Sequence, residues 1–131
     1  MEQNDSIKYW ITISEYDLET AQAMLDSRRY LYVGFMCHQS IEKVLKAIYV
    51  KHNNEFPPRI HNLARLIEYT KLQSEIPGEH LEIIHELNPL NIMSRYPDQE
   101  FEIMNYLSYE YCVELIKKTE RLYIWLKIKA M

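Results

Sequence analysis

The sequence is poor in glycine, with only 2 in 131 residues, and it has no glycine-rich stretch. Phosphate-binding loops and dinucleotide-binding turns need several closely spaced glycines, so both kinds of nucleotide site are excluded. The chain also lacks repeats and any segment rich in Ser and Gly. A disordered chain or a pair of linked domains is therefore disfavoured. We expect one domain over residues 1–131, a length that buries one core.

Positive net charge and long apolar runs are also missing. The 15 Lys and Arg are outnumbered by 19 Asp and Glu, so the whole protein is not a polycation, although a local basic patch remains open. No apolar run approaches the ~20 residues that cross a bilayer, and the N-terminal "MEQNDSIKYW" lacks a signal-peptide core. Cys37 and Cys112, the only cysteines, lie in apolar helical contexts. We expect no membrane association, reduced core thiols and a cytoplasmic protein.

Apolar residues recur at steps of three and four along most of the chain, and no segment alternates with period two. The pattern predicts helices over residues 7–25, 30–51, 61–73, 79–87 and about 99–129. The second is apolar around much of its circumference, as in a central helix, and Gly34 would let a neighbour approach closely. The last would span roughly 45 Å. The predicted fold is all-α, an up-and-down antiparallel bundle of four to five helices.

The last predicted helix carries a second apolar row that one core need not cover: Tyr109, Val113, Ile116 and Tyr123. Exposed rows of aromatic and aliphatic side chains mark interfaces between proteins. We therefore expect a homodimer.

Metal and nucleophilic chemistry find little support. His38 and Glu42 are four residues apart and could share a site, with His61 or His85 as a third ligand from another helix. The His-Glu-x-x-His and Cys-x-x-Cys patterns are absent, so we interpret His38 as a histidine satisfied by a surface carboxylate. Neither cysteine has a partner that would activate it. We expect no metal and no cofactor.

The connector "SRYPDQEF" combines an arginine, an aromatic residue, a proline and a carboxylate. Pro97 moves Tyr96 away from helical dihedrals, and Asp98 stands where the last helix needs an N-cap. Arg95 adds positive charge beside a helix N-terminus that is already positive, which is unfavourable unless an anion shares the site. A carboxylate such as Glu42 and a phosphate are both open as that anion.

Two lysines on the second predicted helix, Lys43 and Lys46, are three residues apart and share a face. Glu42 is four residues from Lys46 and can pair with it. The face is interpreted either as solvated helix surface or as a patch that attracts anions.

Four stretches together resemble the HEPN domain family: "WITISEYDLETAQAML", "CHQSIEKVLKAIYV", "FPPRIHNLARLIE" and "NPLNIMSRYPD". The resemblance implies a helical bundle that commonly forms homodimers. It also implies a minimal nucleotidyltransferase as partner, in a two-component pair that is frequently of toxin–antitoxin type. Many members of the family are metal-independent ribonucleases, in which an arginine is followed four to six residues later by a histidine.

The sequence departs from that ribonuclease pattern. Arg95 matches the arginine, but Glu100, Phe101 and Glu102 occupy the positions expected for the histidine, and no histidine follows Arg95. We therefore assign no catalytic residue. The leading hypothesis is a dimeric module that binds nucleotide or RNA phosphate. Its expected ligand-binding residues are Arg95, Tyr96, Asp98, Lys43, Lys46, His38, Glu42 and His61.

Two alternatives stay open. One is a ribonuclease with a displaced acid–base residue such as His61. The other is a purely structural interaction protein, in which the connector only stops and caps helices.

Overall fold

The computed structural model describes residues 2–131, and every regular element in that range is helical. The predicted all-α bundle is therefore confirmed. The six α-helices are α1 (Gln3–Asp26), α2 (Tyr30–Asn53), α3 (Leu63–Tyr69), α4 (Gly78–Leu87), α5 (Pro97–Tyr106) and α6 (Tyr109–Ala130). Two single 3₁₀ turns, η1 (Asn88–Leu90) and η2 (Ile92–Ser94), connect α4 to α5.

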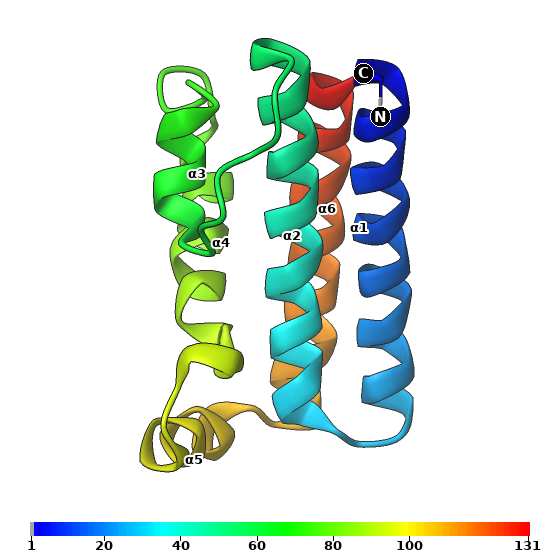
Figure 1. Cartoon of the computed structure of the whole chain (residues 1–131). Coiled ribbons are helices and arrows are strands. Elements are labelled where there is room, and N and C mark those ends of the chain that lie inside the picture. Colours follow the sequence, from blue (N-terminus) through cyan, green and yellow to red (C-terminus); the bar gives the residue numbers. More distant parts are fainter. Residues whose placement is uncertain (1) are drawn as a thin grey trace.

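The three long helices α1, α2 and α6 lie side by side (Figure 1). The shorter α3 and α4 flank the other side of α2, and α5 lies across one end of the bundle (Figure 1). The start of α1 and the end of α6 are at the opposite end of the bundle from α5. No helix within residues 2–131 combines the length and the apolar character that crossing a membrane requires.

α2 is the central helix, as its apolar circumference predicts. Val33, Ile41 and Leu45 are among the many side chains of α2 that are fully buried. Gly34 allows η1 to approach, since a Cβ at this position would lie 3.1 Å from Cδ1 of Leu90. The close approach expected at this glycine is therefore present.

The single last helix predicted over residues 99–129 is wrong, because the chain breaks into α5 and α6 at Leu107 and Ser108. Leu107 has non-helical dihedrals and a buried side chain. The Ser108 hydroxyl accepts a hydrogen bond from the Tyr111 backbone N–H at 3.1 Å and so caps α6. The break lets α5 turn across the end of the bundle while Ile103 and Leu107 stay in the core.

The capping role predicted for Asp98 is also wrong. α5 begins with Pro97 at its first position, where the missing N–H costs nothing, and Tyr96 takes the N-cap position. The Tyr96 N–H donates to the Gln99 side-chain oxygen at 3.1 Å. Asp98 is exposed in the first turn, where its charge suits the helix dipole.

The apolar row predicted to be uncovered on the last helix is largely covered by the protein's own core. Ile116 and Tyr123 are buried, and the Tyr123 hydroxyl donates to Glu15 of α1 at 2.6 Å. Tyr109 remains exposed. α1 covers this row because it packs directly against α6.

Candidate functional site

A cleft of about 390 Å³ opens between the loop before α3 and the segment that connects α4 to α5. Its lining consists of polar side chains and one proline: His61, Asn62, His85, Asn88, Pro89, Asn91 and Arg95. The cleft therefore brings two imidazoles, three amides and one guanidinium to one surface.

Arg95 is the only lysine or arginine in the lining of this cleft. Its Nε donates a hydrogen bond to the Pro89 carbonyl at 3.2 Å, which anchors the half-buried guanidinium. No carboxylate of residues 2–131 lies within 4 Å of it. The internal salt bridge to Glu42 that the sequence left open is thus not formed, and the positive charge of Arg95 is not neutralised by the described chain.

His61 contacts a buried carboxylate, that of Glu42 of α2. The Lys46 Nζ and the His61 Nδ1 each lie 3.0 Å from a Glu42 oxygen. Burial acts to raise the pKa of Glu42, but Lys46 and His61 outweigh it, and the pKa is lowered. The ionised carboxylate accepts a hydrogen bond from the Nδ1–H group of His61. The second ring nitrogen, Nε2, belongs to a side chain that is largely exposed.

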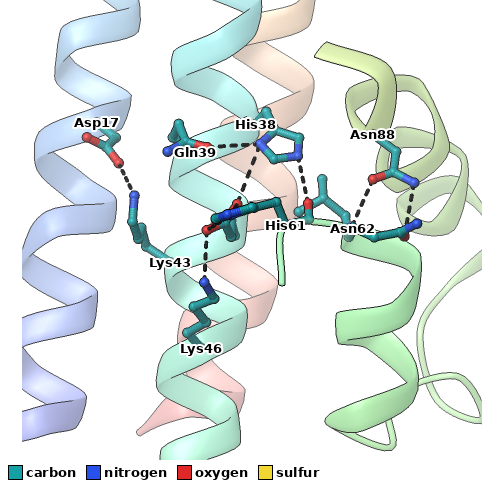
Figure 2. Close-up of polar contacts among 10 residues, drawn as sticks. Asp17, His38, Gln39, Lys43, Lys46, His61, Asn62 and Asn88 are labelled. Atoms are coloured by element: carbon teal, nitrogen blue, oxygen red, sulfur yellow. Dashed lines mark hydrogen bonds and ion pairs between the residues drawn. The ribbon is translucent and has the colours of Figure 1, made fainter. Parts of the chain in front are cut away.

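His38 fixes the backbone of the same loop. Its side chain is fully buried, and its Nε2 lies 3.1 Å from the His61 carbonyl oxygen (Figure 2). A carbonyl only accepts, so Nε2 of His38 carries the proton and donates it. Burial lowers the pKa of His38 against the opposing effect of Glu42, so the ring is neutral at pH 7 and Nδ1 is an acceptor. The Gln39 Oε1 lies 3.2 Å from Nδ1, and a half-turn of that amide would turn its N–H group toward Nδ1.

Two asparagines tie the loop to η1. The Asn62 side-chain oxygen caps α3 by accepting from the Arg65 N–H at 3.1 Å, and it also accepts from the Asn88 amide at 3.2 Å. The Asn88 oxygen in turn accepts from the Leu63 N–H at 2.8 Å (Figure 2). This pair therefore links the loop before α3 to η1, and both segments line the cleft.

The structure gathers some of the predicted site residues and separates others. His61 and Arg95 line the cleft, whereas His38, Glu42 and Lys46 form the buried layer behind it. The last three are therefore placed to position His61.

The remaining predicted residues lie outside the lining. Tyr96 is 76 % exposed beside Arg95, and Asp98 follows in α5. Lys43 contacts Asp17 of α1 at 3.3 Å (Figure 2). Burial raises the pKa of Asp17, and Lys43 opposes that rise. The participation of Tyr96, Asp98 and Lys43 in ligand binding stays a prediction.

Two expectations about this part of α2 need correction. Lys46 is only 6 % exposed and is paired with Glu42, so this part of α2 is not a solvated face. Glu42 itself is a buried carboxylate and not the surface one expected beside His38. Both are hidden because other elements pack around α2.

Sequence reasoning missed several lining residues: His85, Asn62, Asn88 and Asn91. The sequence suggests His85 only as a metal ligand. The pattern "HN" before an apolar run is an N-cap signal that identifies Asn62, but nothing local links it to Asn88. Their proximity follows from the packing of α3 against α4.

Metal and thiol chemistry gain no support from the described residues. Within residues 2–131 no group of three or more His, Cys, Asp or Glu side chains could hold a metal ion. Cys37 and Cys112 are free and buried, and burial raises the pKa of their thiols to about 12 and about 11. Both thiols are therefore protonated at neutral pH and weak as nucleophiles.

Comparison with known proteins gives two kinds of match. The family model for the HEPN domain matches residues 7–129. The crystal structure of TT1696 from Thermus thermophilus aligns with a TM-score of 0.79 at 18% identity, covering 94% of this chain and 97% of that one. The crystal structure of ST0689, an archaeal HEPN homologue, aligns with a TM-score of 0.72 at 22% identity, covering 95% and 98%. No curated protein matches the sequence.

Proposed function

The chain belongs to the HEPN domain family, and from that premise we propose that it is a dimeric module that binds the phosphate of a nucleotide or RNA. The observation that carries the proposal is the Arg95 guanidinium, anchored in a polar cleft with no carboxylate of residues 2–131 within 4 Å. A phosphate oxygen placed there would accept charge-assisted hydrogen bonds from the guanidinium. α5 begins two residues later, but its first turn lies outside the cleft lining and carries the carboxylates of Asp98 and Glu100, so the positive charge of the cleft is that of Arg95.

The binding experiment compares the wild type with Arg95→Ala in titrations with mononucleotides and short RNAs. We expect saturable binding that weakens about tenfold or more in the variant, because a charge-assisted hydrogen bond to phosphate is lost. Arg65→Ala, which removes an exposed arginine of α3 outside the cleft, is the matched control. Equal affinities for Arg95→Ala and Arg65→Ala, or no saturable binding by the wild type, would remove the proposal.

The proposed dimer uses a face different from the row expected on the last helix. Four large apolar side chains are exposed on η2, on α5 and on the two-residue link between them: Met93, Tyr96, Phe101 and Met104. They flank Arg95 in the sequence, so pairing of two such faces brings two clefts near each other. Light scattering should report a dimer for the wild type and a monomer for Phe101→Glu. Ile124→Glu, on an exposed position of α6, should remain a dimer.

Family membership also supports a nucleotidyltransferase partner in a toxin–antitoxin-like pair acting in the cytoplasm. HEPN domains are often encoded beside minimal nucleotidyltransferases. Co-expression with a nucleotidyltransferase encoded next to this protein, followed by purification through a tag on one chain, tests the pairing. Recovery of the tagged chain alone would refute it.

A second candidate function is a metal-independent ribonuclease, and the Glu42–His61 contact favours it. The buried Glu42 carboxylate accepts the Nδ1–H of His61, so Nε2 is the nitrogen that can act as a base. A carboxylate orients the catalytic histidine of hydrolases in the same way. In this scheme Nε2 takes the proton of a ribose 2′-hydroxyl, whose oxygen attacks phosphorus while the 5′-oxygen leaves. His85 would protonate the leaving oxygen and Arg95 would stabilise the phosphorane charge.

RNA incubated with the protein in EDTA separates the two functions. Cleavage that disappears in both His61→Gln and Arg95→Ala, and persists in Arg65→Ala, supports the ribonuclease. RNA that binds but stays intact leaves the binding module as the function.

A further inference from the structure

A second pocket, of about 250 Å³, lies where the N-terminal turns of α1 meet the end of α2 and the loop that follows it. Three aromatic rings and three polar side chains are prominent in its lining: Tyr9, Trp10, Phe56, Ser6, Asn54 and Glu55. Phe56 is 64 % exposed, and Tyr9 is also exposed. Phenylalanine is seldom left so open to water, and a cluster of exposed aromatic rings marks a binding surface.

The rings are arranged edge to face. The Trp10 ring lies 5.6 Å from Tyr9 and 6.2 Å from Phe56 between centroids, with interplanar angles of 75° and 69°. Rings set nearly at right angles do not stack face to face, so the exposed Phe56 keeps ring surface open to a flat ligand although Arg59 lies over its ring.

Positive charge already lies against two of these rings. The Lys46 Nζ is 5.8 Å from the Trp10 centroid, and the Arg59 guanidinium carbon is 5.0 Å from that of Phe56. Lys46 is paired with Glu42, so Arg59 is the charge beside these rings that would repel a cationic ligand such as a methylated ammonium. A neutral aromatic group suits the same surroundings, and Arg59 can face a negatively charged chain attached to it, whereas the Glu55 carboxylate would repel that chain. Ser6 and Asn54 offer hydrogen-bonding groups to the edge of the aromatic group.

The loop from Phe56 to His61 connects this pocket to the Arg95 cleft. It runs from the end of α2 down to the start of α3 (Figure 1). Five residue steps cover at most roughly 18 Å, a distance that a short RNA spans. Arg59 lies between the two ends and is exposed, where it can meet a phosphate of the same strand.

We propose that the Tyr9–Trp10–Phe56 pocket binds an unpaired nucleobase of the RNA whose phosphate occupies the Arg95 cleft. This proposal rests on the proposed function and names its substrate class as single-stranded RNA of several nucleotides. Base stacking on aromatic side chains tolerates any sequence, so the pocket adds affinity with little sequence preference.

The test uses Trp10 fluorescence in a Trp125→Phe background, which removes the only other tryptophan. Titration with a single-stranded adenosine hexamer should quench Trp10 in a saturable manner. Phe56→Ala should weaken hexamer binding about tenfold, the change expected from one lost stack, and Phe56→Tyr should restore it. Tyr16→Ala, an exposed aromatic position of α1 outside the pocket, should bind like the parent.

The outcomes separate this inference from the proposed function. Hexamer affinity that depends on Arg95 but is unchanged in Phe56→Ala, with no quenching of Trp10, overturns the base pocket and leaves phosphate binding intact. Quenching that is lost in Phe56→Ala but unaffected by Arg95→Ala supports an aromatic base site and overturns the link to the Arg95 cleft. Absence of saturable hexamer binding overturns both. Melting temperatures of the variants identify any that are misfolded.

Discussion

Replacing Glu42 by glutamine removes the negative charge at the centre of the buried network while it keeps the size of the side chain. The Lys46 ammonium, 3.0 Å away and almost fully buried, would then lack its counter-charge. Removing one partner of a buried ion pair costs about 3–5 kcal/mol. The Trp10 ring near Lys46 remains and offsets about 1 kcal/mol of that cost. We therefore expect the free energy of unfolding to fall by about 3 kcal/mol at pH 7.

The same charge predicts a pH dependence. Lys46 and His61 overcome the effect of burial and hold the pKa of Glu42 below its usual 4.5. A carboxyl group with a lower pKa in the folded state than in the unfolded state stabilises the fold above pH 4.5, and that stabilisation is lost as the pH falls further. The difference in stability between wild type and Glu42→Gln should therefore shrink below pH 4.5.

Urea unfolding followed by circular dichroism measures these effects. For the wild type and Glu42→Gln we expect equal dependence of the unfolding free energy on urea and a lower midpoint for the variant. Adding Lys46→Met removes the unpaired ammonium, so the double variant should recover part of the lost stability. A cost below about 1 kcal/mol for Glu42→Gln, the range of exposed pairs, would refute the reasoning. A double variant less stable than Glu42→Gln would do the same.

Three further predictions use the same urea assay. Burial lowers the pKa of His38, so the wild type should lose stability as the pH falls below 6.5, where the imidazole of the unfolded chain binds a proton. His38→Gln should make this loss smaller. Parallel curves of stability against pH for the two proteins would contradict this. Ser108→Ala should cost about 1 kcal/mol and Ser108→Gly only a few tenths, because Ser108 caps α6; equal stability of the wild type and Ser108→Ala would exclude the cap. Leu45→Ala should lower the free energy of unfolding by about 2–5 kcal/mol, since Leu45 is fully buried. Ile124→Ala, on the exposed face of α6, should change it by no more than about 0.5 kcal/mol. Similar costs at the two positions would contradict the assigned core.

The helices were predictable because hydrophobic period is a local property of the chain. Apolar steps of three and four identified α1 and α2, and the nearly all-apolar circumference of α2 placed it at the centre. The break before α6 was not predictable in this way. No glycine or proline marks Leu107 and Ser108, and Ser108 fits the periodic stripe as a small residue. The break follows from the burial of Leu107 at the end of the bundle.

The site was only partly predictable. Spacing along one helix predicted the Glu42–Lys46 pair, and the connector drew attention to Arg95. Spacing says nothing about depth, so the burial of that pair was missed. His61 and Arg95 are far apart in the sequence and meet because α3 and α4 pack beside α2. The single domain over residues 1–131 and the ligand-binding roles stay predictions.

By itself, the order of residues determined that this protein is a helical bundle, which helix is central, and where an arginine stands beside a helix N-terminus. Those properties depend on neighbours within a few positions, where periodicity and capping act. Only the tertiary structure decided that Glu42 is hidden and ionised, that His61 receives its orientation from it, and that Arg95 shares a cleft with two histidines. Burial and contacts between distant segments set the charge and direction of each of these groups, and both exist only after the helices have packed.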